Sequence, residues 1–215
     1  MSSGKCSGLV IRATALREAD LIVTILSPEL GRLSAVARSG RRSKKRFMGG
    51  VDIFDCAEFE LSPPRGSSNL YTLSGMQNRT PWPRLRSSLR KFALASLAVE
   101  TAEALSHEGD PDAALLFNPL KAVLTGIDRS TTSQQAHECI VFFLLQTLRE
   151  SGYDPTHLPF EDAENLRAWW EEMTARGKPT PAQAENHVSR SFSVLCGFVE
   201  NTLNRALKSR TQLGL

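Results

Sequence analysis

The hydrophobic pattern of this chain changes its period once, and that change limits the folds available to it more than any other feature. Up to Leu73, apolar residues occur in short runs that are rich in β-branched side chains and partly alternate with polar residues, as in strands. From Pro83 onward, apolar residues recur every three or four positions, as in helices. The sequence therefore predicts a β-rich N-terminal part, a helical remainder and a boundary within residues 78–83.

Five short strands are predicted before that boundary. They lie around Leu9 and Ile11 and over residues 21–26, 32–38, 51–61 and 70–73. Several of the connections contain proline and glycine in turn positions, as in residues 28–31 and 63–68. Short strands joined in this way are typical of a small closed barrel, which avoids long exposed sheet edges.

Helices are predicted over the rest of the chain. They cover residues 85–105, 110–124, 131–149 and 161–176, and a last helix carries an apolar stripe from Val188 to Leu207. Asp110 followed by Pro111 is a typical helix start, and residues 180–183 read as a capping box. The predicted fold class is α+β, with a five-stranded barrel in residues 1–79 and an all-helical domain in residues 80–215.

One segment of the predicted barrel carries most of its positive charge. Residues 31–47 contain no acidic residue and seven cations, namely Arg32, Arg38, Arg41, Arg42, Lys44, Lys45 and Arg46. The first half alternates as a strand, with Leu33, Ala35 and Ala37 on one face. The second half contains glycine, serine and charge, and is predicted to be a loop that leaves the strand.

Cations at this density need either full solvation or an anionic partner. A solvated loop tip is the ordinary interpretation. The length of the segment, its lack of acids and its interleaved glycine and serine, which let backbone amides reach phosphate oxygens, favour nucleic acid. Phe47 and Tyr71 fit base stacking about as well as they fit the barrel core. These two aromatic residues and the seven cations are the candidate contacts to nucleic acid.

Composition and cysteine spacing limit the class of protein further. The chain has 215 residues and a net charge of +3, and its four cysteines form no CxxC pair. The longest apolar run, residues 139–145, is too short to span a bilayer. We therefore expect a soluble protein of the reducing cytoplasm, with a local basic surface on an otherwise slightly acidic chain.

No catalytic or cofactor site is recognisable in the sequence. No histidine belongs to a nucleophile motif, and no GxxxxGK[ST] loop indicates ATP binding. His137 and Cys139 are two positions apart on a predicted helix, so they point away from one another and do not suit a shared metal. We expect neither an enzyme nor a bound metal or cofactor.

Four separate patches of the sequence carry a resemblance to a known family. They are residues 17–20 with the apolar strand that follows, residues 31–47, residues 152–155 and residues 203–210. In these patches, in this order, the chain resembles the RecO-type recombination mediators of bacterial DNA repair, and residues 31–47 are the most specific of them. The resemblance implies an N-terminal OB-fold barrel followed by a helical C-terminal domain.

The resemblance also implies a role and a set of partners. These are binding of single- and double-stranded DNA, strand annealing, engagement of the single-stranded-DNA-binding protein and recombinase loading with a RecR-type partner, at the nucleoid. The sequence departs from the family in one respect. Many members carry a four-cysteine zinc site after a Gly-Tyr-x-Pro segment, whereas residues 156–160 contain no cysteine. We therefore expect no zinc, and a helix around Trp169 and Trp170 in that region.

Other interpretations stay open. A barrel with a basic loop also suits an RNA- or ribosome-associated protein, and the helical part alone suits a protein adaptor. The acidic tail of the single-stranded-DNA-binding protein needs an apolar groove with a cation at its rim. Lys121 or Arg129, beside a groove between the second and third predicted helices, is the candidate cation. Arg205, Lys208 and Arg210 either neutralise a helix C-terminus or extend the DNA-binding surface.

Overall fold

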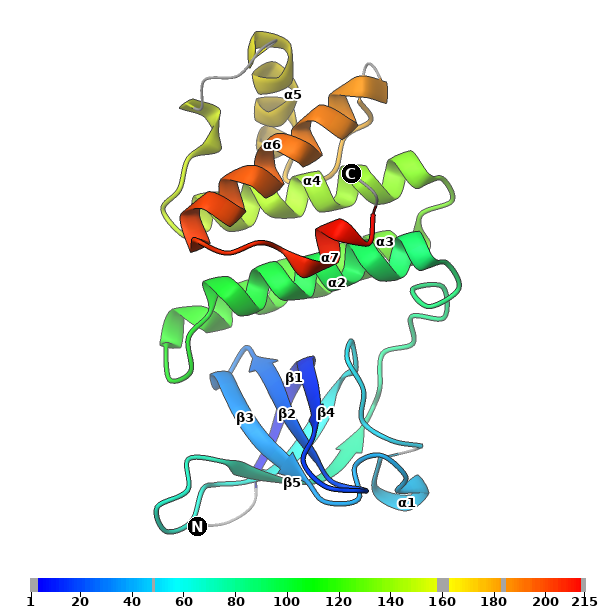
Figure 1. The fold of residues 1–215 in the computed structure, drawn as a ribbon, viewed down its shortest axis with the longest axis vertical. Helices are drawn as coiled ribbons and strands as arrows, with labels where there is room; N and C mark the ends of the chain where they lie inside the picture. Colours follow the sequence, from blue (N-terminus) through cyan, green and yellow to red (C-terminus); the bar gives the residue numbers. More distant parts are fainter. Residues whose placement is uncertain (1–3, 48, 158–162, 183–184, 214–215) are drawn as a thin grey trace. The chain divides into compact units, whose positions relative to one another are not determined.

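The N-terminal strands close into a five-stranded barrel (Figure 1). They are β1 (Gly4–Ala15), β2 (Leu21–Ser27), β3 (Gly31–Ala37), β4 (Cys56–Ser62) and β5 (Tyr71–Gln77). The order around the barrel is β1-β2-β3-β5-β4, with β4 pairing back onto β1. The β3–β5 pairing is parallel and the others are antiparallel. This is the five-stranded barrel of the OB fold, so the predicted fold class is confirmed.

The computed structural model describes residues 4–47, 49–157, 163–182 and 185–213. The chain divides into two compact units. The barrel unit comprises Met1–Pro81 with Ser106–Lys121, and the helical unit comprises Trp82–Leu105 with Ala122–Leu215.

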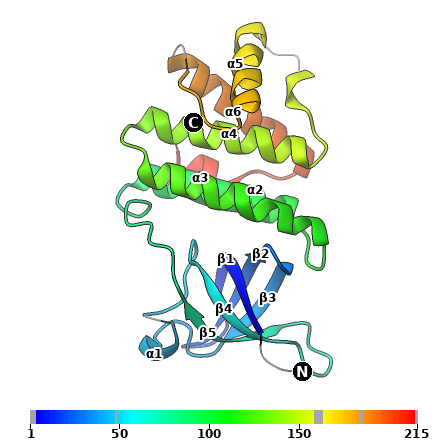
Figure 2. The same cartoon turned by 180° about the vertical axis from the view of Figure 1, so that it is seen from behind.

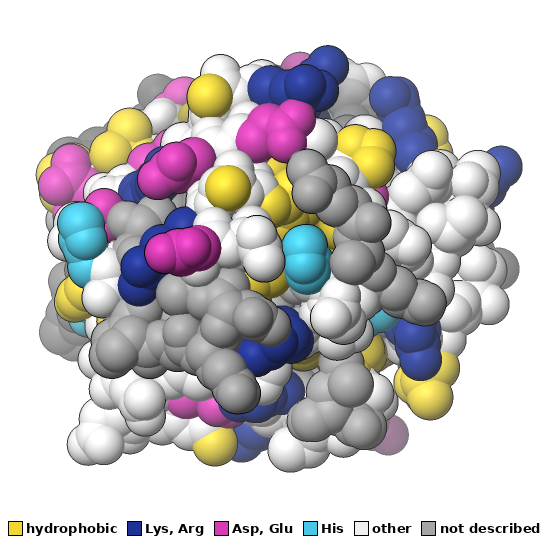
Figure 3. Space-filling model, turned by 90° about the horizontal axis from the view of Figure 1, so that it is seen from above, with side chains coloured by type: hydrophobic (Ala, Val, Ile, Leu, Met, Phe, Trp, Pro, Cys, Tyr) yellow, Lys and Arg dark blue, Asp and Glu magenta, His cyan; other side chains and the backbone are white. Residues whose placement is uncertain are grey.

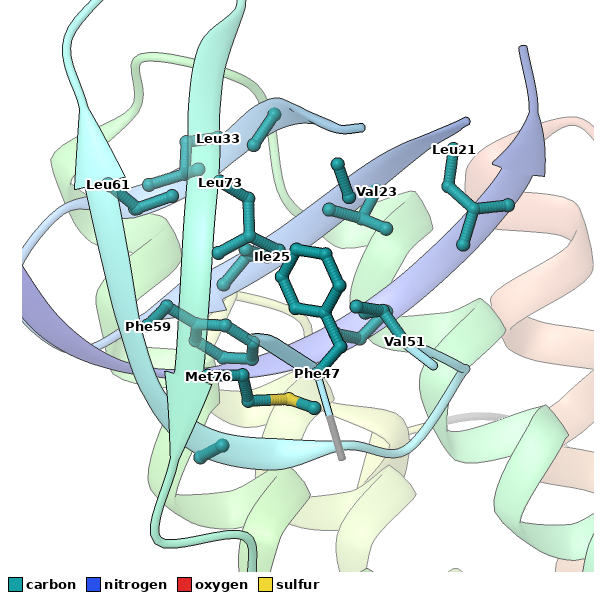
Figure 4. Close-up of a cluster of buried hydrophobic side chains, with 14 of the residues drawn as sticks. Leu21, Val23, Ile25, Leu33, Phe47, Val51, Phe59, Leu61, Leu73 and Met76 are labelled. Carbon is teal, nitrogen blue, oxygen red and sulfur yellow. The ribbon is translucent and has the colours of Figure 1, made fainter. Parts of the chain in front are cut away.

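Alternation of apolar and polar residues builds the barrel interior. In β3, Leu33, Ala35 and Ala37 are buried while the residues between them are half-buried, as the sequence predicts. They join Ile25, Phe59 and other strand residues in one core cluster (Figure 4). At the β2–β3 turn, Gly31 has a φ of +64° and lies so close to the backbone oxygen of Asp110 that an added Cβ would be 2.7 Å from it. A side chain there would therefore be strained in conformation and in space.

The fourth strand is shorter than predicted. It begins at Cys56, whereas the sequence pattern predicts a strand from Val51. Phe54 has a φ of 72°, which interrupts extended backbone, and its N–H bonds to the carbonyl of Val10 at 2.9 Å. The carboxylate of Asp55 accepts the N–H of Asp52 at 2.8 Å, so residues 52–55 form a tight turn before the strand.

The segment after the first long helix packs with the barrel. It consists of Ser106–Lys121 and includes the 3₁₀ helix η1 (Pro111–Leu116), which packs against β2 and β3. The backbone N–H of Ser34 bonds to the carboxylate of Glu108 at 3.0 Å. The predicted domain boundary assigns this whole segment to the helical part, whereas in the structure it returns to the barrel.

The helical unit contains the remaining long helices. These are α2 (Leu89–Leu105), α4 (Ser133–Glu150), α5 (Ala163–Arg176) and α6 (Glu185–Leu203), with the short α7 (Lys208–Thr211) and the end of α3 (Phe117–Arg129). Helix α4 packs against α2, α5 and α6, and α7 packs against α2 (Figures 1 and 2). None of the described helices has the length and apolar character needed to cross a membrane.

Two helix starts agree with the sequence pattern, whereas α2 begins at Leu89 and not at the predicted residue 85. The side chain of Asp110 accepts the N–H of Asp112, although the single helix predicted from there is η1 followed by α3. A capping box starts α4 at Thr132. Both Trp169 and Trp170 are buried in α5, which confirms the predicted helix there. Residues 161 and 183, part of two other predicted helix starts, lie outside the described residues.

Candidate nucleic-acid interface

The cations of the sequence gather where β3 leaves the barrel. We call residues 38–47 the basic loop; it ends in the short helix α1 (Lys44–Phe47), which packs against β5. Five of its side chains are exposed, those of Arg38, Arg41, Arg42, Lys45 and Arg46. The side chain of Lys44 lies outside what the structure describes. The described cations therefore face solvent on a loop held against the barrel.

Backbone hydrogen bonds fix the first half of the basic loop. Ser39 has a φ of 55°, and its N–H bonds to the carboxylate of Asp20 at 2.8 Å. The N–H of Arg41 bonds to the carbonyl of Ala19 at 3.2 Å, which ties the loop to the β1–β2 turn. Gly40 is buried, and an added Cβ would lie 2.9 Å from that of Ala37. The loop thus has a defined path despite its charge.

The cations of the loop differ in how strongly the protein engages them. The guanidinium of Arg46 donates to the carbonyl of Arg38 at 2.9 Å and lies 5.4 Å from the ring centroid of Phe47. That of Arg41 makes a long 3.5 Å contact with the carbonyl of Glu18. Among the described residues, the side chains of Arg38, Arg42 and Lys45 have no hydrogen-bond or ion-pair partner, so these three are the most available to an external anion.

The prediction that Phe47 stacks on a base is wrong for this structure. Its side chain is 0% exposed and points into the barrel core, near Ile25, Val51 and Leu73 (Figure 4). Its ring therefore anchors α1 to the barrel and leaves no face for a base. Tyr71 is half-buried at the start of β5 and packs against the same core, so part of its ring remains accessible.

Arg32 is separated from the basic loop. It lies at the start of β3, six residues before Arg38, which in an extended strand is roughly 20 Å. Its guanidinium donates to the carbonyl of Ser106 at 2.5 Å. Arg32 thus helps to hold the returning segment, and the structure does not group it with the exposed cations.

Two residues that the sequence interpretation did not single out shape the loop. The guanidinium of Arg79 donates to the carbonyls of Phe47 at 3.1 Å and Gly50 at 2.7 Å, and its ion pair with Asp55 spans 3.3 Å. Asp20 holds Ser39, as described above. Asp20 lies within one of the four resembling patches, but no sequence signal marks Arg79, because its partners are backbone carbonyls about thirty positions away.

The thiols do not suggest nucleophilic chemistry. Burial raises the pKa of Cys139 to about 11 and that of Cys196 to about 12, and it also raises the pKa of Cys6 and Cys56. Within the described part of the chain, no three His, Cys, Asp or Glu side chains form a group that could hold a metal ion. The five exposed charged side chains of the basic loop are cations, which suit electrostatic binding of anions.

The other cations named by the sequence lie elsewhere. Lys121 is exposed, with its ammonium 5.9 Å from the ring centroid of Phe117, and belongs to the barrel unit. Arg129 is exposed at the end of α3 and belongs to the helical unit. Arg205 and Arg210 are ion-paired with Glu100 at 3.3 Å and Glu200 at 2.5 Å, so both are engaged within the helical unit.

By its fold, this protein is an OB-fold protein that has a cationic loop at the end of β3 and a helical unit after the barrel. The model of the family described as Recombination protein O N terminal matches residues 1–82, and Recombination protein O C terminal matches residues 86–157. The chain belongs to the recombination protein O family.

Individual relatives support this membership. The chain is 32% identical to the DNA repair protein RecO of Dehalococcoides mccartyi (strain ATCC BAA-2266 / KCTC 15142 / 195) over 151 residues, 70% of this chain and 57% of that protein. It is 31% identical to the DNA repair protein RecO of Syntrophus aciditrophicus (strain SB), over 70% of this chain and 56% of that protein. It is 33% identical to the DNA repair protein RecO of Anaeromyxobacter dehalogenans (strain 2CP-1 / ATCC BAA-258), over 72% of this chain and 59% of that protein. The matched part thus spans little more than half the length of these relatives.

Proposed function

We propose that this protein is a DNA-binding recombination mediator in bacterial DNA repair. In this proposal it binds single- and double-stranded DNA, anneals strands and assists recombinase loading on DNA coated by the single-stranded-DNA-binding protein. The observation that carries the proposal is the set of five exposed cations on the basic loop of an OB-fold barrel.

The physical argument is electrostatic. The loop lies in an acid-free stretch from Gly31 to Val51, so the cations have no acidic neighbour within their own segment. A phosphate backbone releases its counterions when such cations replace them, which favours binding at low salt. Partly exposed Tyr71 offers one aromatic surface in the barrel unit for a base, a common addition in single-strand binders.

Family membership supports DNA over other polyanions. The relatives are named DNA repair proteins, and the proposal extends that role to this chain. Its partners are then the acidic tail of the single-stranded-DNA-binding protein and a RecR-type protein. Lys121 or Arg129 is the proposed carboxylate-binding cation for the tail, because each is exposed on α3.

Competition between DNA and RNA tests the proposal. A labelled single-stranded oligonucleotide is displaced by unlabelled single-stranded DNA or by structured RNA, with wild type and with a variant that carries Arg41→Ala, Arg42→Ala and Lys45→Ala. We expect unlabelled DNA to compete better than structured RNA, and the variant to bind the labelled oligonucleotide weakly.

A matched control removes three exposed cations from other parts of the same barrel unit, through Lys5→Ala, Arg12→Ala and Arg65→Ala. It should bind nearly as wild type does. Preferential displacement by structured RNA would instead support an RNA- or ribosome-associated role.

A further inference from the structure

A second concentration of cations lies on the helical unit. Between residues 79 and 99 the chain has no acidic residue. Arg84, Arg86 and Arg90 of this stretch are exposed, as is Arg129 at the end of α3. We call these four arginines, together with Trp82, the corner patch.

Hydrogen bonds bring these separate segments to the corner between α3 and α4. The carboxylate of Asp128 accepts the N–H groups of Arg84 at 2.7 Å and Leu85 at 3.0 Å. Lys91 donates to the carbonyls of Asp128 at 3.0 Å and Ser130 at 2.8 Å, the residues on either side of Arg129. Residues before α2 and at its start are thereby held beside Arg129.

Arg90 extends the corner patch toward α4. Its guanidinium donates to the hydroxyl of Ser133, the first residue of that helix, at 2.8 Å. The acid that joins the corner, Asp128, is buried and already accepts two backbone N–H groups. It offsets one positive charge at most, and Arg84, Arg90 and Arg129 form no ion pair among the described residues, so this surface keeps an excess of positive charge.

Trp82 adds an aromatic surface to the corner patch. Its indole N–H donates to the hydroxyl of Thr125 at 3.2 Å, one helical turn before Arg129, and its side chain is partly exposed. Cations beside an accessible aromatic ring are the two elements with which proteins hold single-stranded nucleic acid, through phosphates and stacked bases. An acidic peptide would use the cations but would not require the ring.

A different face of the helical unit shows how such charges are usually arranged. Figure 3 looks onto the end of the molecule at which α5 and α6 lie, where some of the described Lys and Arg side chains, mainly on the left of the view, are next to Asp and Glu. Arg176, for example, is paired with Glu172 at 2.9 Å. Cations neutralised in this way offer little to a polyanion.

We infer that the corner patch is a second surface for single-stranded nucleic acid, with Arg84, Arg86 and Arg129 on phosphates and Trp82 stacked on a base. This rests on the proposed function and extends it to the helical unit. Because it places Arg129 on a phosphate, it leaves Lys121 as the cation for the carboxylate of the tail. The surface is distinct from the basic loop, because its residues all belong to the other compact unit.

Tryptophan fluorescence provides a direct test. Of the three tryptophans, Trp169 and Trp170 are buried, so stacking of a base on Trp82 should dominate any quenching by oligothymidylate. We expect saturable quenching in wild type and in the basic-loop variant Arg41→Ala/Arg42→Ala/Lys45→Ala, and its loss in Trp82→Phe.

Charge variants give a second readout. Arg84→Gln/Arg86→Gln/Arg129→Gln should lower the log–log salt slope of oligothymidylate binding by up to about 2, at roughly 0.7 per phosphate contact. The corresponding lysine substitutions should restore the slope. The control Arg176→Gln/Lys178→Gln removes two exposed charges from elsewhere in the helical unit and should leave the slope unchanged.

The possible outcomes separate the two proposals. One outcome is that the basic-loop variant loses binding, while Trp82→Phe retains the quenching and the triple glutamine variant of the corner patch retains the salt slope. In that case the proposed function stands and this inference is overturned. If both sets of variants bind as wild type does, both proposals are wrong. Quenching of Trp82 by an acidic peptide but not by oligothymidylate would make the corner patch a peptide site and would also overturn the inference.

Discussion

The guanidinium of Arg79 donates a 3.1 Å hydrogen bond to the backbone carbonyl of Phe47. Arg79 follows β5, and Phe47 is the last residue of the basic loop, so this bond holds the end of the loop against the barrel, while Asp20 holds its beginning. The same guanidinium reaches the carbonyl of Gly50 and the carboxylate of Asp55. Arg79, whose guanidinium bonds to the protein, thus helps to position the exposed cations of the basic loop.

Replacing Arg79 by methionine should loosen the loop and leave the strands intact. Methionine keeps much of the aliphatic stem but removes the hydrogen bonds, each worth about 1.5–3 kcal/mol when one group is charged and buried, and less at this partly exposed position. Hydrogen exchange should become faster at Gly50 and Val51, whose amides bond to Phe47 and Gly40. Arg65→Met, an exposed change in the β4–β5 loop, is the control. Unchanged exchange at Gly50 and Val51 would contradict this role of Arg79.

The sequence predicted those parts of the fold that depend on the local pattern of residues. The alternation in β3 places Leu33, Ala35 and Ala37 inside because strand side chains alternate in direction, whatever lies further along the chain. The cap at Asp110 forms for the same local reason.

The parts that the sequence did not predict depend on distant partners. Glu108 accepts the N–H of Ser34 from 74 positions away, which brings the returning segment to the barrel. Phe47 follows a run of cations, and a single sequence does not show whether such a ring is exposed or buried. Its burial is set by α1 folding back on β5. The corner patch was missed because its arginines belong to segments that meet only in the folded unit.

Binding of single-stranded DNA should weaken steeply with salt. If five cations of the basic loop contact phosphates, the log–log slope of affinity against salt should be about −3.5 from this loop, at roughly 0.7 per contact. Substitution of Arg41, Arg42, Lys44 and Lys45 by alanine should flatten it by up to about 2.8.

The melting temperature of this quadruple variant should stay close to that of wild type, because the three of these side chains that the structure describes are exposed. Titrations at several salt concentrations measure the slope. A variant with full affinity and the original slope would remove the basic loop from the interface.

Phe47 should matter for stability and little for affinity. Because its ring is fully buried, Phe47→Ala should cost about 3–5 kcal/mol in the free energy of unfolding, from lost burial and the cavity that remains. Phe47→Leu fills more of the space and should cost less. Urea denaturation measures both, and DNA affinity per folded molecule should be retained in Phe47→Leu. A large loss of affinity in that variant at unchanged stability would return Phe47 to the interface.

The C-terminal segment should be released at acid pH. Glu100 of α2 accepts the N–H groups of Lys208 at 3.0 Å and Ser209 at 2.9 Å, which holds the start of α7. Burial disfavours its charged form, but these hydrogen bonds and that from Arg205 outweigh burial and set the pKa of Glu100 below its ordinary value.

As pH falls through the ordinary glutamate pKa of 4.5, the unfolded chain therefore binds more protons than the folded protein does. The stabilisation by Glu100 is fully present above that pH and is lost as pH falls through the lower pKa of the folded protein.

Glu100→Gln should remove this pH-dependent stabilisation. At pH 7 the variant should lose on the order of 1 kcal/mol, because an amide is a weaker acceptor than a carboxylate for the two N–H groups and the guanidinium. The difference from wild type should shrink as pH falls below 4.5, where wild type becomes protonated as well. Denaturant unfolding at pH 7, 5, 4 and 3 measures it, and Glu171→Gln on the exposed face of α5 is the control. A difference that stays constant across this range, or that grows toward acid pH, would mean that the carboxylate of Glu100 does not hold α7 through its charge.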